Sequence, residues 1–128
     1  MFHLPALGIC VSEARRRLRA LLIDQGVDGE AREDAGLVIS ELFTNAIRYS
    51  ESERITCALR ITGNLLRLEV ADQGRGLTEP QSREAGVDEE SGRGLTLVDA
   101  VAVAWGAQTC PDGRGRLVWA VLRYRSRG

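Results

Sequence analysis

The chain is organised around residues 38–50, which read Val-Ile-Ser-Glu-Leu-Phe-Thr-Asn-Ala-Ile-Arg-Tyr-Ser. In and just before this stretch, apolar residues recur at spacings of three and four, which predicts an amphipathic helix with one face in a core. The apolar positions are Ala35, Val38, Ile39, Leu42, Phe43, Ala46 and Ile47.

Two polar residues, Glu41 and Asn45, lie beside this apolar face. They are four positions apart, so their side chains project from the same side of the helix. A carboxylate and an amide oxygen at the rim of a core can serve a proton transfer and a hard cation. On this helix alone, a solvated glutamate and a surface asparagine explain the pattern equally well.

Composition excludes several chemistries. The 128 residues form one domain with a net charge of −1, so nothing indicates a polyanion-binding protein. All 17 basic residues are arginine. A Walker-type phosphate loop, a protein-kinase-type active site and a Schiff base each need a lysine, so none of them is present in this chain.

The cysteines and the histidine predict neither a disulfide framework nor a zinc site. Cys10, Cys57 and Cys110 are far apart and form no Cys-x-x-Cys pair, and His3 is the single histidine. No apolar run is long enough to span a membrane and no signal-peptide pattern opens the chain. We therefore expect a reduced, cytoplasmic protein with no membrane contact.

Two features precede the central helix. Residues 1–10 can form an edge strand or simply cover the core. Ser12 is the expected N-cap of a first helix that runs to Gln25 and stops at Gly26. Four arginines at positions 15, 16, 17 and 19 favour a solvated helix face, with a docking surface for an acidic partner as the alternative. Asp28 is the expected cap of the central helix.

Two strands and a glycine motif follow the central helix. Alternating apolar residues predict strands over residues 54–62 and 65–71, joined by a two-residue turn at Gly63-Asn64. The second strand ends at Asp72-Gln73-Gly74-Arg75-Gly76. A carboxylate followed by two glycines lets the backbone approach a ligand closely, although the motif alone is weak and also fits a plain turn.

A polar connection follows and ends at a second pair of glycines. Residues 77–92 are predicted to form a lid, because a connection of this length inside a compact domain is usually functional or disordered. It ends at Gly92-Arg93-Gly94-Leu95-Thr96, which opens a helix expected over residues 95–104. The first N–H groups of such a helix suit an anion; a flexible loop before a helix is the alternative.

The remaining residues predict a strand from Trp105, a turn over residues 111–115 and a last strand over residues 116–124. We expect Trp105 and Trp119 in the core and a frayed arginine-rich tail. The element order predicts an α+β two-layer sandwich, in which a mixed, mostly antiparallel sheet is covered by helices on one face.

Together the three motifs resemble the Bergerat-type ATP-binding fold shared by gyrase, Hsp90, histidine kinases and MutL. Within that fold the chain is similar to the small anti-sigma-factor serine/threonine kinases of the SpoIIAB and RsbW type. The likeness rests on Ser-Glu-Leu-Phe-Thr-Asn-Ala-Ile, Val-Ala-Asp-Gln-Gly-Arg-Gly and Gly-Arg-Gly-Leu-Thr-Leu-Val. It covers residues 1–128 as a single ATP-binding kinase-like domain and is weakest over residues 1–10.

The resemblance implies a role for each motif. Glu41 would be the general base, Asn45 would coordinate Mg²⁺, and Asp72 would accept a hydrogen bond from the adenine amino group. The other residues that it places at the ATP are Gly74, Gly76, Gly92, Arg93, Gly94, Leu95 and Thr96. One departure is Tyr49, where many of these kinases have a histidine, and this puts any proton-handling role of that histidine in doubt.

The resemblance also implies partners and a reaction. An enzyme of this type would use Mg-ATP to phosphorylate a serine or threonine of a STAS-type anti-anti-sigma factor, would sequester a sigma factor and would act as a homodimer without touching nucleic acid. Glu41 favours this hypothesis, because binding alone needs no base. The alternatives are a non-catalytic ATP-binding regulatory module that sequesters its partner and, less favoured, a simple ATPase.

Overall fold

The computed structural model describes residues 1–49, 52–73, 95–110 and 113–126. The side chain of Tyr49 lies outside the described part. In chain order the elements are β1 (Phe2–Pro5), the 3-10 turn η1 (Gly8–Cys10), α1 (Val11–Asp24), α2 (Gly29–Tyr49), β2 (Arg54–Thr62), β3 (Leu65–Asp72), α4 (Thr96–Val101), β4 (Ala104–Thr109) and β5 (Arg116–Arg123).

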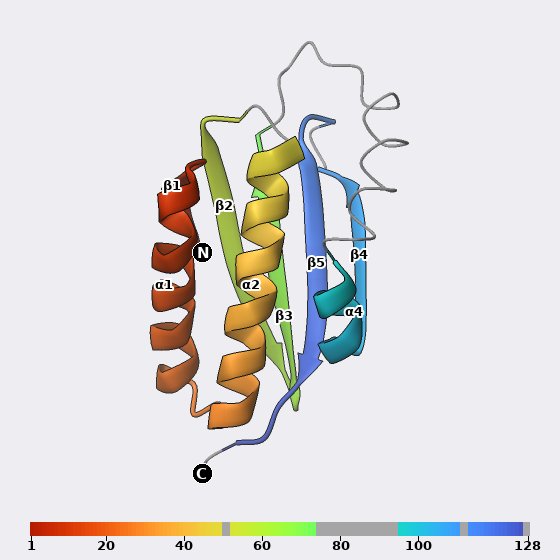
Figure 1. Cartoon of the computed structure of the whole chain (residues 1–128). Coiled ribbons are helices and arrows are strands. Elements are labelled where there is room, and N and C mark those ends of the chain that lie inside the picture. Colours follow the sequence, from red (N-terminus) through yellow and green to blue (C-terminus); the bar gives the residue numbers. More distant parts are fainter. Residues whose placement is uncertain (50–51, 74–94, 111–112, 127–128) are drawn as a thin grey trace.

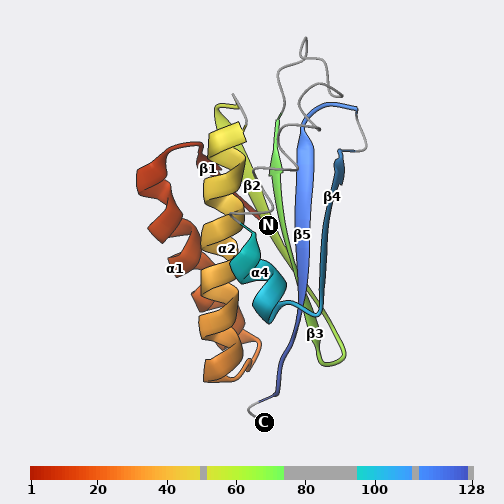
Figure 2. The same cartoon turned by 45° about the vertical axis from the view of Figure 1, so that its right-hand side comes forward.

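The strands form one five-stranded sheet in the order β1-β2-β3-β5-β4. The helices α1, α2 and α4 lie on one face of this sheet (Figures 1 and 2). This confirms the predicted two-layer α+β architecture. The sheet was expected to be mixed, but each pairing between the described strands is antiparallel. No helix within these ranges is long and apolar enough to cross a lipid bilayer.

The core lies between α2 and the inner face of the sheet. Phe43 and Leu42 of α2 are fully buried, as are Leu66 and Leu68 of β3. Burial of a side chain of this size contributes about 1.5–3 kcal/mol to folding, so this seam is a major source of stability. Leu4 of β1 is also buried, and β1 pairs with β2, so the N-terminal residues form the edge strand.

The helix starts follow the predictions only in part. Helix α1 begins at Val11 and its N-cap, Cys10, makes no side-chain cap bond, so the Ser12 cap was wrong. The reason is that η1 already brings the backbone into a helical conformation before Ser12. Gly26 follows α1 with a φ of 74°, as a helix stop requires, and Asp28 accepts a hydrogen bond from the N–H of Ala31 at 3.2 Å, which confirms the α2 cap.

The strand predictions agree closely with the sheet. Strands β2 and β3 pair from Ile55 with Asp72 to Thr62 with Leu65, so Gly63-Asn64 is the two-residue turn of the hairpin. Gly63 has a φ of 60°, a value that residues other than glycine rarely adopt.

Helix α4 and the C-terminal tail differ from their predictions. Helix α4 ends at Val101, because the N–H of Val103 already donates to Val121 O at 2.7 Å and β4 joins the sheet from there. The tail was expected to fray, yet Arg125 donates its N–H to Asp28 Oδ1 at 2.7 Å, and Ser126 forms a β-bridge with Val27.

All three cysteines are free, as the sequence predicts. Cys57 is buried in the sheet, and burial raises the pKa of its thiol to about 12. It therefore stays neutral and acts as an apolar core residue.

Trp119 lies on the sheet face that the helices leave open, so its predicted place in the core was wrong. Its neighbours along β5, Val118 and Ala120, point inward and are buried. The indole ring lies against Gly106 of β4, and the guanidinium carbon of Arg67 stands 4.6 Å from its centroid. Arg67 in turn donates to Glu69 at 2.7 Å. These polar side chains shield the tryptophan from water.

We predict that Gly106→Ala destabilises the protein by about 1–3 kcal/mol, because the new Cβ would lie 2.8 Å from Cζ2 of Trp119. Thermal unfolding of the variant measures this loss. Gly8→Ala is the control, since a Cβ there meets no atom within 4 Å. In the Trp119→Leu background the same glycine change is expected to be nearly neutral; an equal loss in both backgrounds would contradict the contact.

Candidate functional site

The topology brings two of the three sequence motifs to one end of the sheet. Helix α2 ends at Tyr49 and β2 begins at Arg54, so the two elements meet at this end. Asp72 is the last residue of β3 and pairs with Ile55, near the start of β2. The C-terminal half of α2 and the end of β3 therefore lie together at the upper end of Figure 1.

The two predicted site residues of α2, Glu41 and Asn45, lie in the C-terminal half of the helix and differ in exposure. Asn45 is 7% exposed and is the single polar or charged side chain buried among the described residues. Glu41, one turn earlier, is half-buried. No hydrogen bond or ion pair joins its carboxylate to another residue within the described ranges. A buried amide beside an available carboxylate departs from ordinary core composition, which favours a functional role for both.

Asp72 is held from the neighbouring strand. Its Oδ1 accepts a hydrogen bond from the backbone N–H of Arg116 at 3.1 Å. Gly115 packs directly against it, and the Cys110 Sγ lies 4.0 Å from its carbonyl oxygen. The carboxylate is therefore positioned by β5 and by the turn before it, which are more than 35 residues away in sequence.

Ser52, which follows α2, and Arg54, the first residue of β2, hold Gln73, the residue directly after Asp72. The N–H of Gln73 donates to Ser52 Oγ at 2.7 Å, and the Gln73 side-chain oxygen accepts from the N–H of Arg54 at 3.1 Å. These two bonds tie the segment that carries Asp72 to the segment that leaves α2.

The third motif is described only at its end. Leu95 is 1% exposed and anchors the start of α4 in the core, while Thr96 is the first residue of the helix and is exposed. Helix α4 has six residues, so its dipole is weaker than that of the longer helix predicted. The predicted lid over residues 77–92 and the predicted ligand contacts Gly74, Gly76, Gly92, Arg93 and Gly94 lie outside the described residues.

Sequence reasoning missed the residues that hold Asp72 in place. Gly115 and Arg116 act through the backbone, and Gln73 acts through its N–H and its side-chain oxygen on a distant segment, so none of these contacts leaves a local pattern in the sequence. One available signal was the Gly113-Arg114-Gly115 run directly before β5, which resembles the other two glycine motifs.

This combination of a two-layer fold, a buried Asn45 on α2 and a braced Asp72 at the end of β3 defines a domain of the histidine kinase-like ATPase class. The family described as "Histidine kinase-like ATPase domain" matches residues 4–121, and the chain belongs to this family. Membership implies that the chain binds ATP. A search of curated proteins finds no significant relative.

Two solved structures illustrate the likeness. A chain in the crystal structure of the SiaB–SiaC complex from Pseudomonas aeruginosa aligns with a TM-score of 0.62 and 17% identity, over 94% of this chain and 88% of that one. The Acinetobacter baumannii histidine kinase AdeS aligns with a TM-score of 0.49 and 15% identity, over 98% of this chain and 69% of that one. The first of these alignments supports the fold.

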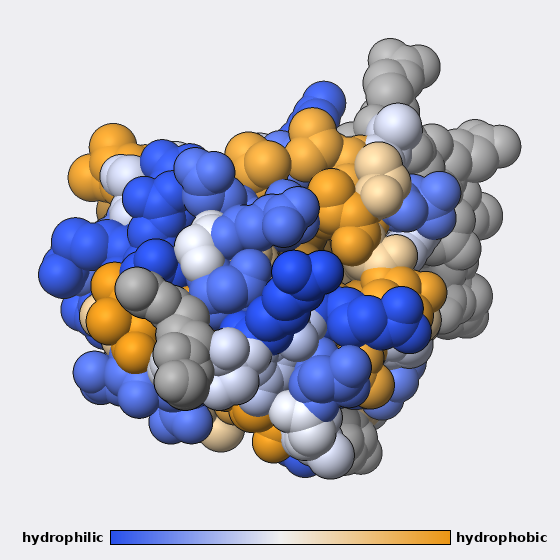
Figure 3. Space-filling model, turned by 90° about the horizontal axis from the view of Figure 1, so that it is seen from below, coloured by the Kyte–Doolittle hydropathy of each residue, from blue (hydrophilic) through white to orange (hydrophobic). Residues whose placement is uncertain are grey.

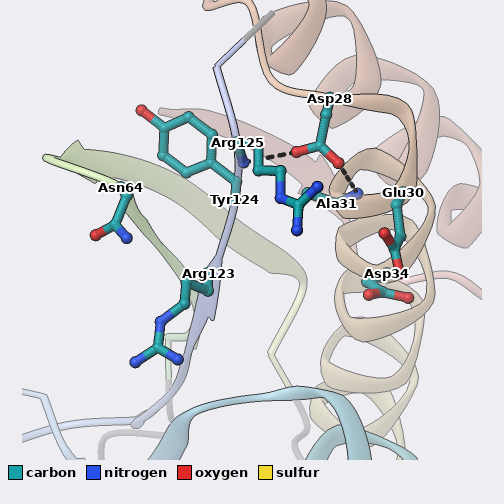
Figure 4. A pocket seen from close by; sticks show the side chains of 8 residues that line it. All are labelled: Asp28, Glu30, Ala31, Asp34, Asn64, Arg123, Tyr124 and Arg125. Carbon is teal, nitrogen blue, oxygen red and sulfur yellow. Dashed lines mark hydrogen bonds between the residues drawn. The ribbon is translucent and has the colours of Figure 1, made fainter.

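A separate cleft of about 330 Å³ lies at the opposite end of the sheet and contains none of the predicted site residues. Seen from below, that end presents mainly hydrophilic side chains (Figure 3). Figure 4 shows its lining: Asp28, Glu30, Ala31 and Asp34 from the start of α2 face Asn64, Arg123, Tyr124 and Arg125. Burial and the neighbouring carboxylates raise the pKa of Asp34.

Asp28, one of the residues that line this cleft, has a structural role. Its two oxygens accept the N–H groups of Arg125 and Ala31, and its own N–H donates to Arg125 O at 3.0 Å. The residue thus joins the start of α2 to the segment after β5. The hydrogen bond from Arg125 lowers the pKa of the Asp28 carboxyl.

We predict that Asp28→Ala lowers the melting temperature at pH 7 and that the difference from the wild type shrinks at acid pH. A carboxyl whose pKa is lowered in the folded state stabilises the protein above its unfolded pKa of about 4 and loses that contribution as pH falls through the folded value. Melting curves at pH 7 and pH 3 test this. Asp24→Ala, at the exposed end of α1, is the control. A difference that is independent of pH would contradict the prediction.

Proposed function

We propose that the chain is a Mg-ATP-dependent serine/threonine protein kinase and anti-sigma regulator. It would phosphorylate a STAS-type anti-anti-sigma partner and sequester a sigma factor. The observation that carries the proposal is the half-buried Glu41 carboxylate, one turn from the buried Asn45, at the sheet end where Asp72 is braced. A domain that only binds ATP needs Asn45 and Asp72, but it does not need a general base such as Glu41.

In this proposal the Asp72 carboxylate would accept a hydrogen bond from the adenine amino group. Leu95 and Thr96, at the start of α4, would contact the phosphates, and the resemblance assigns the same role to Gly74, Gly76, Gly92, Arg93 and Gly94. Backbone N–H groups and arginine would then supply the positive charge that lysine provides in other kinases.

Asn45 fits a magnesium site only if the nucleotide completes it. The described residues contain no group of three His, Cys, Asp or Glu side chains that could hold a metal. Magnesium commonly takes one or two protein ligands, with phosphate oxygens and water as the others. The amide oxygen of Asn45 is a suitable hard ligand, and the bound ion would neutralise charge on the phosphates.

Glu41 would act on the acceptor hydroxyl. The serine or threonine oxygen forms a bond to the γ-phosphorus, the bond from that phosphorus to the bridging oxygen breaks, and ADP leaves with the electron pair. The hydroxyl proton passes to the Glu41 carboxylate. A positioned base of this kind contributes about 10²–10⁴-fold to a rate.

The partners follow from the resemblance and from one structural neighbour. The SiaB–SiaC structure is a complex of two proteins, which supports a regulatory domain that acts on a protein partner. The same observation favours a second candidate, a non-catalytic ATP-binding module that sequesters its partner. A homodimer is the assembly proposed for either function.

Replacement of Glu41 distinguishes the two functions. We predict that Glu41→Gln keeps the ATP affinity of the wild type and lowers phosphoryl transfer by about 10²-fold or more, because the amide cannot accept the proton. Calorimetry measures binding, and phosphoserine or phosphothreonine formation on a STAS-type protein of the same organism measures transfer.

Glu33→Gln is the matched control, since it makes the same change on the exposed face of the same helix. If the wild type binds ATP but transfers no phosphate, the binding module is the correct function. If Glu41→Gln transfers phosphate at the wild-type rate, the general-base assignment is wrong.

A further inference from the structure

The turn between β4 and β5 lies against Asp72, the residue proposed to bind the adenine amino group. The turn is closed by two backbone hydrogen bonds, from Cys110 N–H to Gly115 O at 3.1 Å and from Gly113 N–H to Cys110 O at 2.8 Å. Gly113 and Gly115 both have a positive φ, of 80° and 72°. Their surroundings differ, however, and this difference points to a function for one of them.

Gly115 is in a confined position. A Cβ at this residue would lie 2.9 Å from Asp72 Oδ1 and 2.9 Å from the carbonyl carbon of Gln73, and closer still to the carbonyl oxygen of Asp72. Two of these three atoms belong to the backbone, which cannot move aside as a flexible side chain can. A Cβ at Gly113, in contrast, meets no atom within 4 Å. Of these two glycines, only Gly115 must lack a side chain for the turn to approach Asp72 this closely.

The close approach has a consequence for the carboxylate. Because Gly115 lets the chain pass so near, the N–H of Arg116 reaches Asp72 Oδ1 at 3.1 Å. Rotation of an aspartate carboxylate about its last torsion is broad and weakly restricted. A fixed backbone donor on one oxygen restricts that rotation and so fixes the direction in which the carboxylate accepts other hydrogen bonds.

We infer that Gly115 and the backbone N–H of Arg116 are positioning elements that set the selectivity of the site for adenine over guanine; this rests on the proposed ATP site. A fixed carboxylate accepts a hydrogen bond from the adenine amino group, whereas the carbonyl oxygen at the same place in guanine repels it. A site built to accept a hydrogen bond rejects the analogue that lacks the donor, because its polar group is then left unpaired.

The test compares two glycines of the same turn. Gly115→Ala is expected to weaken ATP binding by about tenfold or more and to bring the ATP and GTP affinities close to each other, as a lost charged hydrogen bond implies. Gly113→Ala carries the same unfavourable φ but no contact with Asp72, so it is expected to keep the wild-type ratio of ATP to GTP affinity. Calorimetry with both nucleotides gives this ratio. Melting curves without nucleotide measure how much each alanine destabilises the fold through its unfavourable φ.

A second variant applies if Gly115→Ala fails to fold. Arg116→Pro removes the backbone N–H at the first residue of β5, where a proline is tolerated. It is expected to lower the ATP-to-GTP ratio in the same way, and Asp72→Asn provides the reference for a lost carboxylate.

The outcomes separate the two proposals. A wild-type protein that prefers ATP, together with a Gly115→Ala or Arg116→Pro variant that keeps that preference, would overturn the positioning role and leave the ATP site intact. A wild-type protein that binds neither nucleotide would overturn the ATP site and the positioning role together. Loss of preference in these variants, with Gly113→Ala unchanged, supports the inference.

Discussion

One buried face of α2 holds the domain together. It runs along the helix from Ala31 to Ala46 and packs on the sheet through Leu42 and Phe43, both fully buried. The same face orients the site, because Asn45 lies within it near the end of the helix, while Glu41 lies at its edge. Packing that stabilises the fold thus also places both residues on the same side of the helix, with Asn45 buried and Glu41 half-buried.

The sheet supplies the other half of the candidate site through contacts between distant segments. Asp72 ends β3, and its position depends on β5 through Arg116 on one side and on the segment after α2 through Gln73 on the other. The carboxylate is therefore held in place before any ligand binds, as selective recognition requires. The cleft at the opposite end is stabilised by the hydrogen bonds of Asp28 and has no residue in common with this site.

Local sequence patterns predicted much of this architecture. The helix around residues 38–50, the hairpin at Gly63-Asn64 and the Asp28 cap depend on local patterns, and all three are confirmed. The exposure of Trp119 and the length of α4 were not predictable in the same way. The first depends on which face of the sheet the helices leave open, and the second on where the chain after α4 pairs with β5. The sequence motif identified Asp72 but not the hydrogen bond that holds its carboxylate, because a backbone donor such as the N–H of Arg116 cannot be recognised from the residue type.

The proposed roles of Glu41, Asn45 and Asp72 all depend on Mg-ATP binding at the end of the sheet that carries Asn45 and Asp72. Calorimetric titration of the wild type and of Asn45→Ala with ATP, each with and without Mg²⁺, measures this binding. We expect Mg²⁺ to strengthen ATP binding in the wild type and this gain to be lost in the variant. ATP binding that is the same in both proteins, or no binding in the wild type, would contradict it.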